Sequence, residues 1–245
     1  MATAIVFGVT SRIARETALR FAECGMTVIV TGRDPAELER IAADVRVRTG
    51  ATAVAQAFDA RDALAHRGLI ADLEAAHGPI EYAVLAFGDM GEQRQAEHDP
   101  DLLVRVLETN FVGAAALCEA LAEPMAERGR GGIAVLGSVA GDRGRQSNYI
   151  YGSAKGGLAV YLQGLRNRLF ARGVHVMTVK LGFIDTRMTW GLKTKIPIAS
   201  PEAASRAIVG GLDRRVDTLY YPAFWRVVMT VLRHVPERAF KRLSL

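Results

Sequence analysis

The sequence predicts an α/β fold, a doubly wound parallel sheet in a single domain, followed by a C-terminal amphipathic helical tail. Short apolar runs alternate with longer amphipathic stretches, as strands and helices alternate in βαβ units. The short runs are nearly unbroken Val, Ile, Ala and Leu, which is typical of parallel strands covered by helices on both faces. The length of 245 residues suits one large domain. Half of the residues are hydrophobic, a composition that excludes a disordered or fibrous chain.

The elements are predicted in chain order. We expect strands at residues 3–7, 26–31, 51–57, 80–87, 132–136 and 174–180. We expect helices at residues 12–24, 35–48, 61–76, 149–172 and 201–212, and a long helix over 100–128 that is either continuous or kinked near Pro124. Asp34 and Pro35 form a helix start, with the Asp as the cap, and Gly50 is a stop signal.

The net charge of +5 is concentrated at the C-terminal end. Residues 223–245 carry five basic residues and one acidic residue. The near-neutral remainder has no basic stripe with interleaved aromatics, so nucleic acid is not an expected partner. Cys24 and Cys118 form no disulfide framework, which favours a reducing, cytoplasmic compartment. Neither a membrane-spanning run, a signal peptide nor a metal site is expected.

The first strand-to-helix turn is the expected nucleotide site. In a doubly wound sheet this turn lies at the carboxyl ends of the strands, where ligands bind. A helix N-terminus there offers free N–H groups and a partial positive charge to a pyrophosphate. The candidate ligands of the turn are Gly8, Thr10, Ser11, Arg12 and Ile13. The alternative is a helix start that binds nothing.

The end of the second strand favours NADP(H) over NAD. An acidic residue there would bind the adenosine ribose hydroxyls. This chain has Gly32 and Arg33 instead, and Arg33 can meet a 2′-phosphate, although it can also be a solvated turn charge. Asp34 is interpreted as a helix cap. Asp59, after the third strand, is either a ligand of the adenine amine or an ordinary turn residue.

Ser138, Tyr151 and Lys155 form the candidate catalytic group. Tyr151 and Lys155 are four residues apart and share a helix face, and Ser138 follows the fifth strand. A lysine ammonium beside a phenol should lower its pKa from the ordinary value near 10. We expect Tyr151 to protonate a carbonyl oxygen as hydride reaches the carbon, while Ser138 holds that oxygen. Asn110, inside the long helix, should bond a group such as a water leading to Lys155, or mark a kink. Lys180 is interpreted as a surface or loop charge.

These features resemble the short-chain dehydrogenase/reductase family over residues 3–220. The segment 151–155 matches the family's Tyr-x-x-x-Lys motif, and Ser138 and Asn110 lie at matching positions. The resemblance implies a Rossmann-type fold, NAD(P)-dependent carbonyl–alcohol chemistry on a ketone substrate, and a homodimer or homotetramer. It gives Lys155 contacts to the nicotinamide ribose. It also implies cofactor contacts from Ala86, Gly88, Tyr151, Gly182, Ile184 and Thr186.

The resemblance has departures in the nucleotide turn. Phe7, Arg12 and Ala14 stand where the family's T-G-x-x-x-G-x-G motif has Thr and two Gly, and Leu181 replaces a Pro. Arg12 must therefore either contact the phosphates or point away from them.

A narrower resemblance is to reductases of polyprenyl-phosphate-linked 2-keto pentoses. It rests on the segments 86–88, 149–155, 185–188 and 222–236. It implies a lipid-phosphate-linked 2-keto sugar as substrate and a flavin oxidase as partner. We expect a catalytic domain over 1–222 and a separate terminal helix over 223–245.

The terminal helix is predicted to be basic and amphipathic. Its apolar stripe comprises Phe224, Val227, Val228, Val231, Leu232 and Val235, and it is widened by Trp225 and Met229. Its basic face comprises Arg226, Arg233, Arg238, Lys241 and Arg242. Such a helix suits peripheral binding at the inner face of a membrane or a lipid phosphate, or docking on the body or on a second subunit. A segment before Pro197 is either a solvated loop or a lid over an anionic substrate, formed by Arg187, Trp190, Lys193 and Lys195.

Three functions remain open at this point. The first is an NADPH-dependent reductase of a lipid-linked ketone. The second is a soluble enzyme of a small ketone or alcohol whose tail serves oligomerisation. The third is a catalytically silent NADP-binding regulator.

Overall fold

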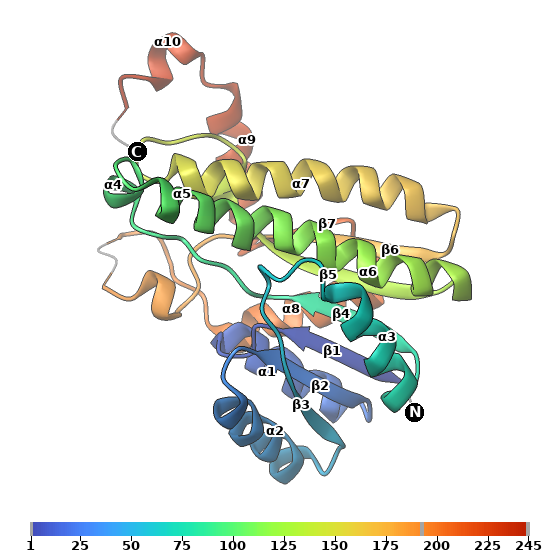
Figure 1. Cartoon of the computed structure of the whole chain (residues 1–245). Coiled ribbons are helices and arrows are strands. Elements are labelled where there is room, and N and C mark those ends of the chain that lie inside the picture. Colours follow the sequence, from blue (N-terminus) through green and yellow to red (C-terminus); the bar gives the residue numbers. More distant parts are fainter. Residues whose placement is uncertain (1, 192–193, 244–245) are drawn as a thin grey trace.

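In the part of the chain that the structure describes, seven strands form one parallel sheet in the order β3-β2-β1-β4-β5-β6-β7. The computed structural model describes residues 2–191 and 194–243 (Figure 1). The strands are β1 (Thr3–Phe7), β2 (Thr27–Gly32), β3 (Ala53–Ala57), β4 (Ile80–Leu85), β5 (Gly131–Ser138), β6 (Val174–Leu181) and β7 (Thr218–Tyr221). The predicted doubly wound sheet is confirmed, and its strand order reverses between β1 and β4.

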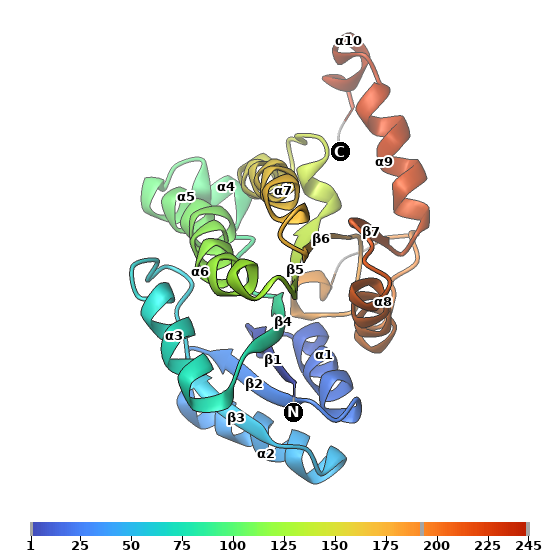
Figure 2. The same ribbon diagram turned by 90° about the vertical axis from the view of Figure 1, so that its right-hand side faces the viewer.

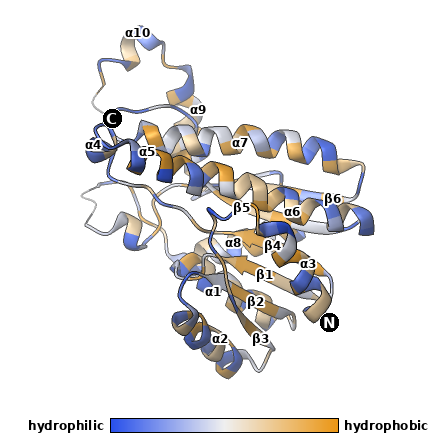
Figure 3. Ribbon diagram, in the orientation of Figure 1, coloured by the Kyte–Doolittle hydropathy of each residue, from blue (hydrophilic) through white to orange (hydrophobic). Residues whose placement is uncertain are grey.

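Helices cover both faces of the sheet. The main helices are α1 (Arg12–Glu23), α2 (Pro35–Thr49), α3 (His66–His77), α5 (Pro100–Leu107), α6 (Gly113–Arg128), α7 (Tyr149–Phe170) and α8 (Pro201–Asp213). One face packs against α1, α2 and α8, and the other packs against α3, α6 and α7 (Figures 1 and 2). The central strands are largely apolar (Figure 3), so the two cores meet at the sheet and hold the strand ends in a fixed register.

The long helix predicted over 100–128 is interrupted, but not at Pro124. A π-helical turn, η1 (Glu108–Val112), separates α5 from α6, and α6 continues through Pro124. The irregularity therefore falls on Asn110, whose side chain bonds both to Val106 in α5 and to Asp89 outside the helix. A π turn of this kind frequently marks a functional position.

Other differences concern the ends and small elements. The third major helix begins at His66 rather than Arg61, because residues 59–65 form turns, and β4 ends at Leu85 rather than Phe87. The strand β7 and the short helix α4 (Gln93–Ala96) are not predicted from the sequence. Four-residue elements carry too little periodicity to stand out.

The tail forms α9 (Phe224–His234) and α10 (Glu237–Phe240), and α10 projects away from the sheet (Figure 2). The predicted stripe divides between two faces of α9. Trp225 and Met229, which were expected only to widen the apolar stripe, lie at the centre of the buried face of α9. They pack beside Val139. Val227 and Val231 remain exposed. Among the residues the structure describes, no helix is both long and apolar enough to cross a membrane.

Candidate functional site

The turn between β1 and α1 lies in close contact with the backbone of the segment after β4. Gly8 has a φ of +85° and its N–H donates to the Thr31 carbonyl at 2.9 Å. A Cβ atom at Gly8 would stand 2.8 Å from the backbone nitrogen of Phe87, so only glycine fits between β1 and the segment after β4. The residues predicted to bind phosphate lie here at the carboxyl ends of the strands, with Thr10 and Arg12 exposed and Ile13 buried.

The start of α1 is left open to an anion. Ser11 occupies the cap position without a side-chain cap bond, and the first turn of α1 holds no acidic residue. The starts of α2, α5 and α8, in contrast, are capped by Asp34, Asp99 and Ser200. The free N–H groups and positive end of the α1 dipole therefore suit a pyrophosphate, which is the fit expected of a dinucleotide site.

The end of β2 has no carboxylate free for a ribose. Asp34 caps α2, because its Oδ1 accepts hydrogen bonds from Ala36 N at 3.0 Å and Glu37 N at 3.2 Å. This confirms its predicted role as a cap. Arg33 is exposed beside it. Asp59 Oδ1 accepts from Arg61 N at 3.0 Å, so Asp59 is also a turn residue in this structure.

Ser138, Tyr151 and Lys155 come from β5 and α7 and meet at this edge of the sheet. Tyr151 and Lys155 are 7% and 4% exposed, so both polar groups lie in a closed site. Lys155 Nζ donates to the Leu136 carbonyl at 3.0 Å and stands 5.8 Å from the Tyr151 ring centroid. Ser138 Oγ accepts from Ala140 N at 3.1 Å, which fixes the start of the loop toward α7.

Burial shifts the pKa values of Tyr151 and Lys155 in opposite directions. It raises the pKa of Tyr151 to about 12, and the nearby Ser138 side chain acts in the opposite direction. Burial lowers the pKa of Lys155 to about 8. The predicted lowering of the Tyr151 pKa below its ordinary value is therefore not seen in this structure, because removal of the phenol from water dominates. Tyr151 is held as a neutral phenol, the form that donates a proton.

Gly88 brings the candidate catalytic helix next to Asn110. A Cβ atom at Gly88 would stand 2.9 Å from Asn110 Oδ1 and 3.6 Å from Lys155 Nζ. The Asn110 amide donates to the carbonyls of Asp89 at 2.5 Å and Val106 at 2.8 Å. Its bonds thus fix the segment after β4, where Ala86 and Gly88 lie, against the π turn.

The predicted nicotinamide segment follows β6. Gly182 N donates to the Tyr221 carbonyl at 2.9 Å, Ile184 is buried, and Thr186 caps a short 3-10 turn, η3 (Arg187–Thr189). Arg12 reaches across from the first turn, with guanidinium nitrogens 3.3 Å from Asp185 Oδ2 and 3.4 Å from Glu202 Oε1. Arg12 thus points toward the far wall of the site.

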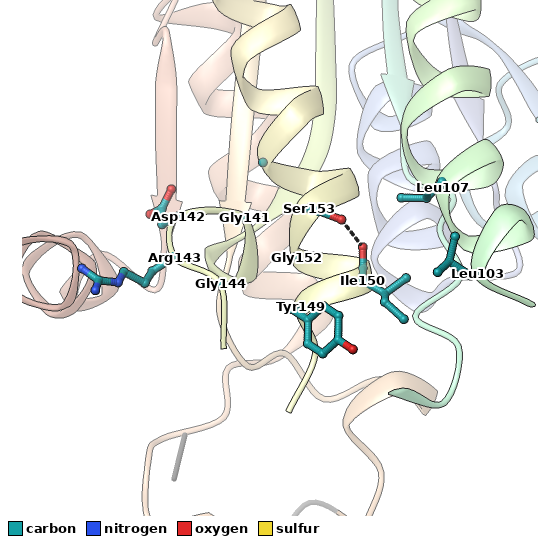
Figure 4. Close-up of a pocket in the computed structure, with 11 residues that line it drawn as sticks. Leu103, Leu107, Gly141, Asp142, Arg143, Gly144, Tyr149, Ile150, Gly152 and Ser153 are labelled. Atoms are coloured by element: carbon teal, nitrogen blue, oxygen red, sulfur yellow. Dashed lines mark hydrogen bonds between the residues drawn. The ribbon is translucent and has the colours of Figure 1, made fainter. Parts of the chain in front are cut away.

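Part of the predicted lid can be placed. Arg187, Trp190 and Lys195 are exposed, and Lys193 lies outside the described residues. A separate pocket of about 550 Å³ opens between α5, α7 and the loop after β5, lined by Leu103, Leu107 and Tyr149 (Figure 4). Ser138 and Tyr151 are not among its lining residues.

A polar cluster that the sequence does not predict lies beside Ser138. Asp142 binds the Lys180 ammonium and accepts from Tyr220 Oη at 2.8 Å, and its side chain is 2% exposed. Lys180 is therefore a paired, largely buried group on β6, and its assignment as a surface charge is wrong. Nearby, Arg145 Nε is buried without a hydrogen-bond partner. No sequence signal links Asp142 to Tyr220, because their contact depends on how β5 and β7 are placed around β6.

Comparison with known proteins gives the same family over most of the chain. The profile of the short chain dehydrogenase family matches residues 2–197. An uncharacterized oxidoreductase of Mycobacterium tuberculosis is 40% identical over 99% of this chain and 97% of its own. An uncharacterized oxidoreductase of Streptomyces coelicolor is 34% identical over 98% of this chain and 94% of its own.

Solved structures share the fold. A short-chain dehydrogenase from Sphingobium yanoikuyae in complex with NADPH superposes with a TM-score of 0.82 at 23% identity, covering 97% of each chain. An actinorhodin polyketide ketoreductase with NADPH gives a TM-score of 0.81 at 24% identity, covering 90% of this chain and 95% of its own.

Proposed function

Because the chain belongs to the short-chain dehydrogenase family, we propose that it is an NADPH-dependent reductase of a ketone. The observation that carries the proposal is the closed group of Ser138, Tyr151 and Lys155 at the carboxyl edge of the sheet. A silent nucleotide-binding regulator has no need of a buried phenol and ammonium at that place.

Tyr151 is the proton donor and Ser138 holds the carbonyl oxygen. The bound cofactor supplies the hydride. The raised pKa of Tyr151 keeps the phenol protonated at neutral pH, which suits reduction rather than oxidation. As the Tyr151 proton leaves, the phenolate gains the support of the Lys155 ammonium, and the Ser138 hydroxyl steadies the developing oxygen charge. Asn110 is a positioning residue that holds the segment after β4 beside Lys155.

The cofactor site extends over the edges of five strands. Its ligands are Gly8, Thr10, Ser11, Arg12, Ile13, Arg33, Asp59, Ala86, Gly88, Tyr151, Lys155, Gly182, Ile184 and Thr186. The uncapped start of α1 receives the pyrophosphate. NADPH is favoured over NADH because Asp34 is used as a cap and Arg33 stands free to bind a 2′-phosphate.

The substrate is a lipid-phosphate-linked 2-keto sugar, of the kind reduced by decaprenylphosphoryl-2-keto-ribose reductase, with a flavin oxidase as the preceding enzyme. The tail supports this choice because α9 exposes Phe224, Val227 and Val231 beside its arginines. That surface suits the polyprenyl chain or the inner face of an anionic membrane. The unpartnered Arg145 Nε on the loop between Ser138 and Tyr151 suits an anionic substrate.

A homodimer through α5 and α7 completes the proposal. Val104 on α5 is 46% exposed, Val112 at the end of the adjoining π turn η1 is 48% exposed, and Val160 on α7 is 68% exposed. The pocket of Figure 4 also opens between α5 and α7. Apolar side chains gathered on two adjacent helices suit a self-complementary contact with a second copy. The tail then lies outside this contact and is free to meet a membrane or lipid.

The test is NADPH oxidation against a panel containing a polyprenyl-phosphate 2-ketopentose and simple ketones. We expect turnover of the lipid-linked compound and a loss of about 10²-fold or more on Tyr151→Phe, with NADPH binding retained. Turnover of simple ketones alone would favour the small-substrate enzyme with an oligomerising tail. Retained turnover in Tyr151→Phe would refute the catalytic assignment. Liposome co-sedimentation that survives truncation after Tyr221 would refute membrane binding by the tail.

A further inference from the structure

Arg143 joins the loop that begins at Ser138 to the C-terminal tail. It lies five residues after Ser138 and eight before Tyr151, and its side chain is only 16% exposed. In Figure 4 it points away from α7 toward a neighbouring helix, and the contacts show that this helix is α9. An arginine in an exposed loop would otherwise be expected to extend into water.

The Arg143 guanidinium closes the end of α9. Its Nη1 donates to the carbonyls of Leu232 at 3.3 Å, Arg233 at 3.0 Å and Val235 at 2.9 Å. These carbonyls lie at the C-terminal end of α9, where a cation is favoured, and the Leu232 carbonyl also accepts from Val235 N at 3.3 Å. Its Nη2 donates to Glu237 Oε2 at 2.8 Å. One side chain thus uses its planar fork for three carbonyls and a carboxylate, which a lysine cannot reproduce.

Two further contacts hold the tail beside this loop. The Arg143 guanidinium carbon lies 4.0 Å from the ring centroid of Phe240 in α10. Trp225, at the start of α9, is 3% exposed and packs beside Val139, the residue after Ser138. A Cβ atom at Gly182 would stand 1.9 Å from Trp225 Nε1, so the indole occupies space that only glycine leaves open.

The same loop rests directly on the helix that carries Tyr151 and Lys155. A Cβ atom at Gly141 would stand 2.6 Å from the Lys155 carbonyl carbon. A Cβ atom at Gly152 would stand 2.9 Å from the Ala140 oxygen. Backbone therefore meets backbone, and a displacement of the loop cannot be absorbed by side chains.

We propose that Arg143 is a positioning residue through which the docked tail sets the geometry of Ser138, Tyr151 and Lys155. The proposal rests on the proposed reductase function only for its kinetic consequence. Its structural part, that the tail orders the loop over 138–149, holds for any reaction at this site. It also gives the inner face of α9 a role that is separate from membrane or lipid binding by the outer face.

The structural test changes the tail and observes the loop. The double variant Glu237→Ala/Phe240→Ala, in the full-length chain, removes two contacts of Arg143 without touching the loop. We expect hydrogen–deuterium exchange of the amides in 138–149 to rise about tenfold, with the β1–α1 turn unchanged. The control pair Arg67→Ala and Glu123→Ala removes an exposed ion pair between α3 and α6, and should change neither region. Unchanged exchange in 138–149 would overturn the proposal.

The reciprocal test changes Arg143 and observes the tail. The chain has two tryptophans, and Trp190 is 89% exposed, so a Trp190→Phe background leaves Trp225 as the reporter. In that background Arg143→Ala should shift the Trp225 emission to the red and open it to acrylamide quenching, and Arg143→Lys should do so only partly. A buried Trp225 in folded Arg143→Ala would refute the proposal. If Arg143→Ala does not fold, Arg143→Lys and the tail variant carry the same comparison.

The kinetic test separates positioning from general stability. With NADPH and the ketone that the panel identifies, Arg143→Ala should lower kcat about tenfold or more, because small misplacements of reacting groups are costly. NADPH binding, measured by energy transfer from Trp225, should stay within about twofold. A loss of thermal stability with unchanged kcat would assign Arg143 a purely structural role. If no ketone on the panel is reduced, the proposed function fails, while the exchange and fluorescence results still decide the proposal.

Discussion

Gly88 lies so close to Asn110 that a Cβ atom at position 88 would stand 2.9 Å from Oδ1 of the asparagine. The same atom would be 3.6 Å from Lys155 Nζ. The absence of one methyl group therefore allows the segment after β4, the π turn and α7 to meet at one point. Asn110 is fully buried there, so it has no room to move away.

Gly88→Ala should disturb this meeting point. Overpacking of this kind costs about 1–3 kcal/mol of unfolding free energy, and kcat should fall about tenfold as Asn110 and Lys155 are displaced. Thermal unfolding and NADPH oxidation measure the two effects. Gly164→Ala in α7 is the control, since a Cβ there meets nothing within 4 Å. Equal behaviour of the two variants would contradict the close packing at Gly88.

The rate of ketone reduction should fall as the pH rises through about 8. The pKa of Lys155 is lowered to about 8 by burial, so its ammonium is lost in that range and no longer supports the Tyr151 phenolate. Lys155→Arg keeps its charge and should move the fall to higher pH. The pH profile of kcat measures this. Tyr151, with its pKa raised to about 12, stays protonated throughout.

The same lowered pKa predicts a change in stability with pH. Between pH 8 and 10.5 the unfolded chain holds the Lys155 proton that the folded chain has released, so the unfolding free energy should rise with pH in this window. Lys155→Met removes this contribution. Denaturant titrations of both proteins at pH 8 and pH 10 should therefore diverge, with the wild type gaining more from the increase.

Arg33→Ala should weaken NADPH more than NADH. A charge-assisted contact to the 2′-phosphate is worth about 1.5–3 kcal/mol, so the KM for NADPH should rise roughly tenfold or more, while that for NADH stays nearly constant. Arg48→Ala, an exposed arginine at the far end of α2, is the matched control. An equal effect on both cofactors would remove Arg33 from the 2′-phosphate site.

Arg12→Ala should separate cofactor binding from stability. Its ion pairs with Asp185 and Glu202 are exposed, and such pairs contribute about 0–1 kcal/mol. The unfolding free energy should therefore change little. If Arg12 turns to the pyrophosphate when NADPH binds, affinity should fall several-fold, and the loss should shrink at high salt. Calorimetric titration with NADPH at two salt concentrations measures it.

The sequence predicted the parts of the fold that depend on local signals. Val, Ile and Ala runs gave the positions of six strands, and the cap at Asp34 marked the start of α2. The edge strand β7 was missed because four residues in Thr218–Tyr221 show no distinct period. The break at Asn110 was noted only as an alternative, since Pro124 is the stronger local signal and yet α6 tolerates it.

The candidate site was predictable where residues of one helix or turn act together, and less so where separate elements meet. Tyr151 and Lys155 share a face by their spacing alone. The direction of their pKa shifts was not predictable, because it depends on burial by surrounding elements. The contacts of Arg143 were also not predictable, since its hydrogen-bond partners in the tail lie 89 to 94 residues further along the chain.

That separation in the chain matters during synthesis. At about 5–20 residues per second, the partners of Arg143 are made roughly 5–20 s after Arg143 itself. All strands are complete before Leu232 is added. The segment that carries Ser138 and Tyr151 is therefore synthesised well before the tail segment that Arg143 binds. Ordering of the loop between Ser138 and Tyr151 by the Arg143 contacts can therefore begin only after a delay set by the synthesis of this distant segment.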